Sequence, residues 1–149
     1  MPNKLTVLLV DDHALVRRGF RRILEDEPSF HVVGEASDGL EAVQLAEQLP
    51  PAVIVMDCAL PQINGIEATR TIRGFAPDMK IIGVSVQAER SYVNEMLRNG
   101  ANGYVTKNSS STEMITAIDE VLAGNTYICE EVRHLRTHQN SDLQGHEHN

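Results

Sequence analysis

Two kinds of hydrophobic pattern alternate along this chain. Short apolar runs, typical of parallel strands buried on both faces, lie at residues 5–10, 51–57, 79–84 and 101–105, and a more polar strand-like segment lies at 30–36. Between them, apolar residues recur every three or four positions, which predicts five helices. This alternation favours an α/β fold, a doubly wound sheet of five parallel strands with helices on both faces.

Capping residues mark the ends of the helices. Asp38 and Ser110 are each followed three positions later by glutamate, the spacing of a capping box at a helix start. Asn99 and Gly100 supply a left-handed cap after the fourth helix. The first helix begins after His13 and leaves its arginines on a solvated face. We expect its inward face to comprise Leu15, Val16, Gly19, Phe20, Ile23 and Leu24.

Polar residues follow the predicted strands at their carboxyl ends. They are Asp11 and Asp12 after the first strand, Asp57 at the end of the third, Ser85 at the end of the fourth and Lys107 after the fifth. In the flavodoxin-like strand order 2-1-3-4-5, the first and third strands are neighbours, and their carboxyl ends form the switch point where such folds bind ligands. We therefore expect three carboxylates, a hydroxyl and an ammonium group at one edge of the sheet.

Composition narrows the class of protein. The chain has 149 residues, of which 42% are hydrophobic and 23% charged, as in an ordinary globular domain. No apolar run approaches the roughly 20 residues of a membrane span, and no signal peptide precedes the first strand, so we expect a cytoplasmic protein without a membrane partner. Cys58 and Cys129 are expected as reduced thiols. The formal net charge of -8 opposes binding of nucleic acid by this chain alone.

Carboxylates gathered at one edge repel one another unless a cation joins them. Oxygen ligands that face solvent suit Mg²⁺, which takes one or two protein carboxylates together with phosphate oxygens. With such an ion neutralising charge, an aspartate can act as a nucleophile towards a phosphoryl group and form an aspartyl phosphate. Lys107 is long enough to pair with one oxygen of that group, and Ser85 can donate a hydrogen bond to another.

The same residues resemble the receiver domain of two-component response regulators, the CheY-like family. The resemblance covers about residues 5–124 and includes Asp11-Asp12, Asp57 followed by Leu60-Pro61 and Gly65, Ser85, Tyr104 and Lys107. Its NarL/FixJ-type branch, whose receivers usually precede a DNA-binding helix-turn-helix domain, is indicated by Asp11-Asp12-His13, by residues 100–104 and by Asn108 rather than proline after Lys107.

The resemblance implies a role for each of these residues. Asp57 is implied as the phosphoacceptor and Lys107 as the ion-pair partner of the phosphate. The implied contacts of Mg²⁺ are Asp11, Asp12, Asp57 and the carbonyl of Ala59. Ser85 and Tyr104 are implied as a switch pair, in which Ser85 bonds the phosphoryl oxygens and the Tyr104 ring turns inward. The implied partners are a sensor histidine kinase, a second copy of the chain, and DNA through a separate C-terminal domain.

We predict a receiver domain at residues 1–124 and a linker or tail at 125–149, disordered or partly helical. No DNA-binding domain fits after Gly124. His134 and His138 have the i, i+4 spacing of metal ligands, but without further ligands we interpret them as part of a solvated tail. The leading hypothesis is the N-terminal part of a DNA-binding transcription regulator. The alternatives are a stand-alone single-domain regulator and a pseudo-receiver that is never phosphorylated.

A phosphatase and a nucleotide-binding protein both fit the sequence poorly, and the expected role is regulatory, limited to self-phosphorylation and self-dephosphorylation. A haloacid-dehalogenase-like phosphatase would need a second aspartate two residues after the nucleophile, where Ala59 stands. Neither glycine-rich nucleotide-binding motif follows the first strand. Two positions bear on the resemblance to receiver domains. Val86 is larger than the residue that many receivers carry after the switch serine. Gln87 occupies a position that, in receivers, tunes the rate at which the phosphate is lost.

Overall fold

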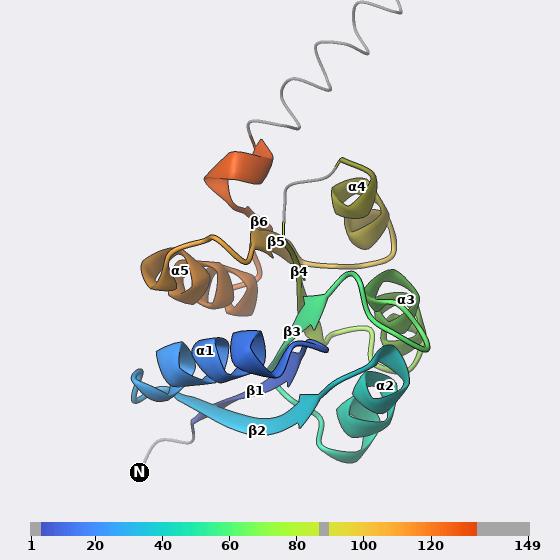
Figure 1. Cartoon of the computed structure of the whole chain (residues 1–149), viewed down its shortest axis with the longest axis horizontal. Helices are drawn as coiled ribbons and strands as arrows, with labels where there is room; N and C mark the ends of the chain where they lie inside the picture. Colours follow the sequence, from blue (N-terminus) through green and yellow to red (C-terminus); the bar gives the residue numbers. More distant parts are fainter. Residues whose placement is uncertain (1–3, 87–89, 134–149) are drawn as a thin grey trace, which may run out of the picture.

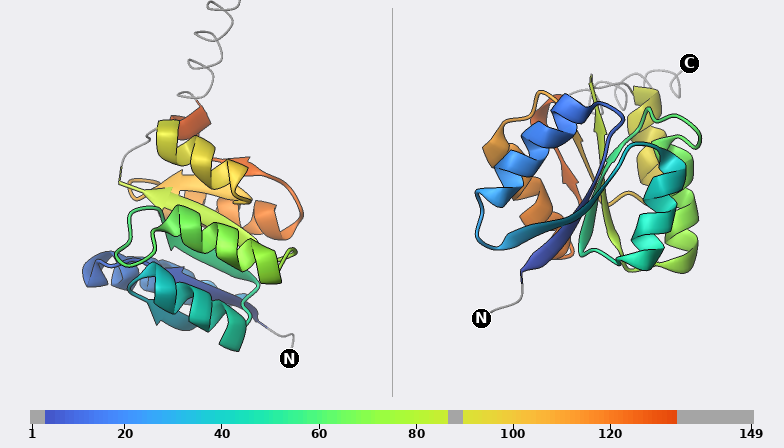
Figure 2. Two further views of the ribbon diagram at one scale, coloured as in Figure 1. Left: turned by 90° about the vertical axis from the view of Figure 1, so that its right-hand side faces the viewer. Right: turned by 60° about the horizontal axis from the view of Figure 1, so that its bottom comes forward.

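One parallel sheet organises the computed structural model, which describes residues 4–86 and 90–133 (Figure 1). Its strand order is β2-β1-β3-β4-β5-β6. The strands are β1 (Leu5–Val10), β2 (Phe30–Ala36), β3 (Val53–Asp57), β4 (Lys80–Ser85), β5 (Gly103–Thr106) and β6 (Tyr127–Ile128). The helices are α1 (Ala14–Glu25), α2 (Gly39–Gln48), α3 (Gly65–Phe75), α4 (Arg90–Arg98) and α5 (Ser111–Leu122). Helices α1 and α5 cover one face of the sheet, and α2, α3 and α4 cover the other (Figure 2).

The predicted order of the first five strands is confirmed, and the structure adds a sixth strand that the sequence analysis did not predict. The sixth strand, β6, has two residues and pairs in parallel with β5, with Tyr127 opposite Gly103 and Ile128 opposite Tyr104. Two residues are too few to show a period of two, so the pattern gave no signal. The strand forms because β5 offers it an open edge.

The core lies on both faces of the central strands. Every residue of β3 is buried, and so are the last four of β1 and the last five of β4. This burial explains why these segments consist of uninterrupted apolar residues before their polar ends.

The inward face of α1 differs in part from the prediction. Phe20 and Leu24 are 8% and 0% exposed, whereas Leu15 is 79% exposed and does not face the core. Arg17 lies 3.0 Å from a carboxylate oxygen of Glu35 on β2, so the arginine face is partly occupied by ion pairs. Val16 and Ile23 are half-buried against the core, so the predicted inward face is wrong at Leu15 but not along its whole length.

The predicted helix caps are confirmed. Asp38 accepts a hydrogen bond from the Glu41 N–H at 2.7 Å, and Ser110 accepts one from the Glu113 N–H at 3.0 Å. Gly100 has a φ of 112°, as a left-handed cap requires. The start of α3 depends on another glycine, since a Cβ at residue 65 would lie 2.0 Å from the Asp57 carbonyl oxygen. Glycine therefore lets the loop after β3 turn back directly beneath Asp57.

Several predictions concern positions that the structure does not describe. Gln87 and the pair His134 and His138 lie outside the described residues. Within residues 4–86 and 90–133, no helix has the length and apolar character needed to cross a bilayer.

Candidate functional site

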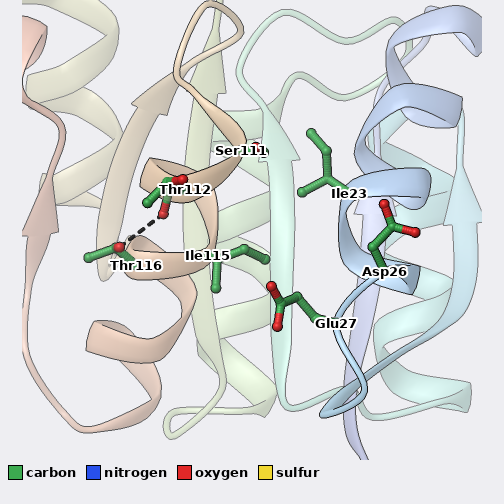
Figure 3. A pocket seen from close by; sticks show the side chains of 7 residues that line it. All are labelled: Ile23, Asp26, Glu27, Ser111, Thr112, Ile115 and Thr116. Carbon is green, nitrogen blue, oxygen red and sulfur yellow. Dashed lines mark hydrogen bonds between the residues drawn. The ribbon is translucent and has the colours of Figure 1, made fainter.

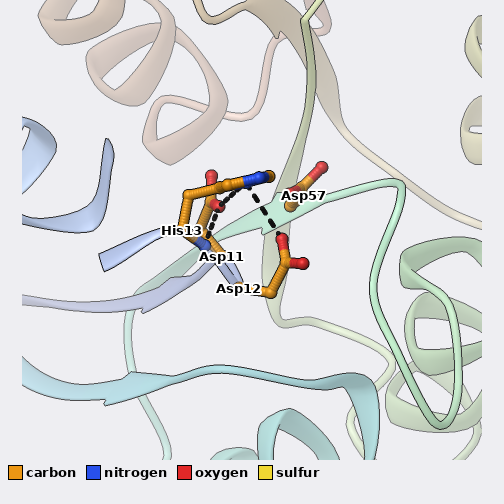
Figure 4. Close-up of side chains that lie close together, drawn as sticks. All are labelled: Asp11, Asp12, His13 and Asp57. Atoms are coloured by element: carbon orange, nitrogen blue, oxygen red, sulfur yellow. Dashed lines mark hydrogen bonds and ion pairs between the residues drawn. The ribbon is translucent and has the colours of Figure 1, made fainter. Parts of the chain in front are cut away.

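Asp11 and Asp57 come together because their strands are neighbours. Strands β1 and β3 pair in parallel, so the residues at their carboxyl ends reach the same edge of the sheet. Asp11, Asp12, His13 and Asp57 each offer one ligand atom, and these atoms lie within 4.8 Å of one another (Figure 4). Asp11 is 2% and Asp57 3% exposed, whereas Asp12 is exposed. The edge therefore holds two buried carboxylates and a third at the surface.

Lys107 supplies the opposite charge from the end of β5. Its Nζ lies 2.9 Å from Asp11 Oδ2 and 3.1 Å from Asp57 Oδ2. Burial lowers the pKa of Lys107, but its hydrogen bonds and charge interactions with Asp11 and Asp57 outweigh this effect, and the pKa is raised. Lys107 is therefore a cation at neutral pH that bridges carboxylates from two strands.

Opposing influences act on the Asp57 carboxylate. Burial and, after it, the negative charge of Asp11 raise its pKa, while the Ala59 N–H and Lys107 act in the other direction; the net shift is upward. The Ala59 N–H donates to Asp57 Oδ1 at 3.1 Å. A buried acid whose titration is shifted by specific charged neighbours is typical of functional sites.

His13 lies over the outer side of the carboxylates (Figure 4). Its backbone N–H donates to Asp11 Oδ1 at 2.8 Å, which holds the start of α1 to the end of β1. The ring Nδ1 lies 3.3 Å from Asp11 Oδ1 and 3.1 Å from Asp12 Oδ1. The imidazole side chain is 64% exposed, so it is a surface group at the entrance to the cluster.

A cavity of about 380 Å³ opens beside the Asp57 carboxylate. Its lining residues are His13, Asp57, Ala59, Ser85, Val86, Tyr92 and Lys107. Its polar groups come from the ends of β3, β4 and β5 and from His13 before α1, while Tyr92 from α4 and the exposed Val86 add bulky side chains to its wall. This volume is at the lower end of the range for ligand pockets, so it suits a small group rather than an extended ligand.

Tyr104 lies behind this cavity, inside the core. Its side chain is fully buried, and the Cys58 thiol donates to the Tyr104 hydroxyl oxygen over 3.5 Å. Burial raises the pKa of Cys58 to about 12, so the thiol keeps its proton at neutral pH. Gly83 on β4 makes room for the ring, because a Cβ there would lie 3.0 Å from Tyr104 Cδ2 and 2.8 Å from Met96 Cε.

Comparison with known protein families identifies the family of this domain. The family of response regulator receiver domains matches residues 7–119. The chain belongs to this family. The receiver resemblance drawn from the sequence is thereby confirmed.

Relatives of this receiver domain are regulatory proteins. The transcriptional regulatory protein DegU of Brevibacillus brevis is 42% identical over 132 residues, which cover 89% of this chain and 56% of that protein. The response regulator UvrY of Escherichia coli is 43% identical over 128 residues, which cover 86% of this chain and 59% of UvrY. The chain therefore spans less than two thirds of the length of these relatives.

Solved structures agree in fold and in branch. A two-component response regulator of the LuxR family from Aurantimonas superposes with a TM-score of 0.84 at 37% identity, covering 91% of this chain and 99% of that one. The signal receiver domain of NarL from Mycobacterium tuberculosis gives a TM-score of 0.80 at 32% identity, covering 83% of this chain and 100% of that one. These similarities confirm the predicted NarL-type branch and the flavodoxin-like strand order.

The receiver domain brings most of the predicted site residues together at one edge of the sheet. They are Asp11, Asp12, Asp57, Ala59, Ser85 and Lys107. Tyr104 is separate from them, because it is buried on the core side of β5 beside Cys58. The roles of these residues in phosphorylation stay predictions.

Sequence reasoning did not assign His13, Tyr92 or Cys58 to the site. A signal existed for His13, which directly follows the two aspartates, and for Cys58, which follows Asp57. Tyr92 gave no signal, since its place in the wall depends on how α4 packs against the sheet.

The carboxylates of the receiver domain fit a hard divalent cation. Oxygen atoms on opposite sides of Mg²⁺ are about 4.2 Å apart, close to the 4.8 Å within which the ligand atoms of Asp11, Asp12 and Asp57 lie. Asp12 is exposed, so an ion bound there would keep water molecules, as Mg²⁺ prefers.

A second cavity, also of about 380 Å³, lies between α1 and α5 (Figure 3). It is lined by Ile23, Asp26, Glu27, Ser111, Thr112, Ile115 and Thr116. The hydroxyl of Thr116 is already used within α5, where it donates to the Thr112 carbonyl oxygen at 2.9 Å. This cavity shares no lining residue with the one beside Asp57.

Proposed function

We propose that this receiver domain accepts a phosphoryl group on Asp57, from a sensor histidine kinase or a small phosphodonor, and thereby switches between two states. The observation that carries the proposal is the buried Asp57 carboxylate, which faces a cavity and has Lys107 Nζ 3.1 Å from its Oδ2. Burial keeps this carboxylate poorly solvated, and the negative charge of Asp11 destabilises its ionised form further. Both effects favour attack on an electrophile once a cation compensates the negative charge.

The transfer uses groups that the chain already holds in place. A carboxylate oxygen of Asp57 forms a bond to phosphorus as the bond between phosphorus and the leaving group of the donor breaks, and the electron pair leaves with that group. Asp11, Asp12, Asp57 and the carbonyl of Ala59 would hold Mg²⁺, which would neutralise charge on the arriving phosphoryl group. Lys107 pairs with one phosphoryl oxygen, and the Ser85 hydroxyl, which lines the same cavity, donates to another.

The switch follows from what Lys107 and Ser85 do in the two states. Without phosphate, Lys107 bridges Asp11 and Asp57; with phosphate, its charge and the Ser85 hydroxyl are drawn to the phosphoryl oxygens. The Tyr104 side chain is fully buried, which supports a switch in which one ring position lies in the core. We propose that phosphorylation stabilises this buried position. A hundredfold shift between two states needs about 2.7 kcal/mol, which an ion pair and a charge-assisted hydrogen bond can supply.

The proposal for the whole protein rests on relatives. DegU is named as a transcriptional regulatory protein, and this chain corresponds to 56% of its length. We propose that the chain acts as the receiver part of such a regulator, in which DNA contacts lie outside the 149 residues. A receiver that acts through protein contacts alone is the alternative, and an open reading frame that continues past Asn149 with a helix-turn-helix pattern would decide against it. Pairing with a second copy stays a prediction.

Intact mass spectrometry tests the phosphoacceptor directly. The 149-residue chain is incubated with Mg²⁺ and acetyl phosphate, and we expect one phosphoryl group per chain, removed by hydroxylamine as an acyl phosphate should be. Asp57→Ala should take none, whereas Asp119→Ala, on the exposed side of α5, should behave as the native chain. A native chain that gains no mass, or an Asp57→Ala variant that gains as much, would overturn the proposal.

A further inference from the structure

We propose that residues 127–133, the last segment that the structure describes and here called the terminal segment, are coupled to the phosphoacceptor site through Thr106. Glu131 is a positioning residue for the turn that carries Lys107. This inference rests on the proposed function of Asp57. It concerns a segment that extends beyond the boundary predicted from the sequence and that no role described so far includes.

The terminal segment is docked on the sheet. Its strand β6 lies along β5, where the Tyr127 N–H donates to the Asn102 carbonyl oxygen at 3.2 Å and the Cys129 N–H donates to the Tyr104 carbonyl oxygen at 3.0 Å. Ile128 is 9% and Val132 0% exposed, so the segment contributes to the core. The backbone of Tyr104 is thus bonded directly to this segment.

Glu113, the residue that completes the cap of α5, also anchors the segment. Its Oε2 accepts from the Tyr127 hydroxyl at 2.9 Å and from the Glu130 N–H at 3.2 Å. Burial and the bond to Glu113 raise the pKa of Tyr127 to about 12, so the phenol remains a donor at neutral pH. The guanidinium of Arg133 lies over the Tyr127 ring, 6.0 Å from its centre.

Glu131 links the segment to the site. The Thr106 hydroxyl donates to Glu131 Oε2 at 3.2 Å, and Thr106 itself is 1% exposed. Thr106 is opposite Ser85 in the sheet, and the next residue, Lys107, donates its N–H to the Ser85 carbonyl oxygen at 2.8 Å. The turn closes where the Ser109 N–H donates to the Thr106 carbonyl oxygen at 3.0 Å.

Thr106 therefore joins the turn to the terminal segment, and its hydroxyl also lies 3.5 Å from Ser109 Oγ within the turn. Its backbone belongs to the turn that places Lys107 against Asp57, and its side chain is bonded to Glu131. Movement of Ser85 or Lys107 towards a phosphoryl group shifts this backbone and changes the contact with Glu131. By linkage, a docked terminal segment favours phosphorylation to the same degree as phosphorylation favours docking.

Two variants remove the contact from opposite sides, and both are tested in the full 149-residue chain with Mg²⁺ and acetyl phosphate. Glu131→Ala removes the acceptor, and Thr106→Val removes the hydroxyl while keeping the shape of a strand residue. Glu130→Ala is the matched control, since it deletes the same charge from an exposed neighbouring side chain. We expect each of the two variants to slow phosphate incorporation about two- to tenfold, the effect of losing one hydrogen bond. The double variant should be no slower than Thr106→Val, which also loses the 3.5 Å contact with the Ser109 hydroxyl, and Glu131→Gln should recover most of the rate.

Hydrogen exchange supplies the reciprocal measurement. In the native chain and in Glu130→Ala, phosphorylation should slow exchange of the Cys129 and Arg133 amides, which bond to Tyr104 and to Cys129. In Glu131→Ala this response should be lost. A phosphorylated native chain with unchanged exchange at these amides, or a Glu131→Ala variant with native rate and native response, would overturn the coupling alone. A native chain that takes no phosphate would overturn the proposed function, and the coupling with it.

Discussion

The charge balance at the sheet edge leads to a strong prediction for Lys107→Met. Methionine keeps the length of the side chain but removes the ammonium that lies 2.9 Å from Asp11 Oδ2 and 3.1 Å from Asp57 Oδ2. Asp11 and Asp57 would then be two buried carboxylates without this cation between them. Two unit charges within 4.8 Å repel by at least about 3.5 kcal/mol at an effective dielectric constant of about 20. Breaking a buried ion pair from one side typically costs about 3–5 kcal/mol, which is of the same size.

We therefore expect Lys107→Met to lose about 3 kcal/mol of unfolding free energy in buffer with a chelator, a large part of the roughly 5–15 kcal/mol of an ordinary domain. Mg²⁺ should restore much of this loss, because it would supply positive charge that the variant lacks beside the two carboxylates. At a concentration of about 100 times its dissociation constant, a ligand adds about 2.7 kcal/mol. Mg²⁺ should thus stabilise the variant more than the native chain. Acidic pH should also reduce the loss, because protonation removes the repulsion.

Urea unfolding followed by circular dichroism measures these differences, with and without Mg²⁺. Lys4→Met is the matched control, since Lys4 is an exposed lysine before β1 and its loss changes the net charge equally. A loss below about 1 kcal/mol for Lys107→Met would mean that the bridge contributes no more than a surface ion pair. If Mg²⁺ stabilised the native chain and Lys107→Met equally, the ion would not be compensating for the missing ammonium.

Two further predictions concern Gly83 and Asp57. Gly83→Ala places a Cβ 2.8 Å from Met96 Cε and 3.0 Å from Tyr104 Cδ2. We therefore expect the free energy of unfolding in urea to fall by about 1–3 kcal/mol and the NMR signals of the Tyr104 ring to be displaced. An unchanged ring signal would refute the account of how glycine makes room for the ring. Asp57→Asn should be more stable than the native chain near neutral pH. Burial, and then Asp11, raise the pKa of Asp57, so its contribution to stability is full below the pKa of the unfolded chain and is lost as pH rises through the folded value. The advantage of Asp57→Asn should therefore shrink at acidic pH, and a gain that is constant with pH would contradict this cause.

The central strands could be predicted from sequence because their environment is uniform. β1, β3 and β4 are covered on both faces, so the run of apolar residues and its polar end are visible without any partner. Once the strands are parallel, their carboxyl ends share one edge, and the meeting of Asp11, Asp57 and Lys107 follows from topology. The bounds of β1 and β2 agree with the predicted ranges, since polar residues stop both runs sharply.

What the sequence did not predict depends on packing between distant segments. Leu15 has the spacing of a core residue but is 79% exposed, whereas Phe20 and Leu24 of the same helix are buried. Glu113 has the spacing of a capping box, yet its carboxylate bonds to Tyr127, 14 residues later. Tyr92 reaches the wall of the site because of where α4 lies. In each case local spacing limits the choices, and a partner far along the chain decides among them.

The electrostatics of the edge explain how one modification can be felt elsewhere in the domain. Asp11 and Asp57 oppose folding unless a cation joins them, and Lys107 reaches them from the end of β5, which pairs with β4. The ion pairs with Asp11 and Asp57 are therefore part of what holds the Lys107 ammonium in place. A phosphoryl group on Asp57 changes the charge balance around Lys107, because the ammonium can then pair with new oxygen atoms farther out in the cavity. The turn that carries Lys107 must respond, and through Thr106 it is bonded to the terminal segment. The repulsion between the carboxylates that opposes folding is therefore also what transmits a change of charge at Asp57 to the turn and to the terminal segment.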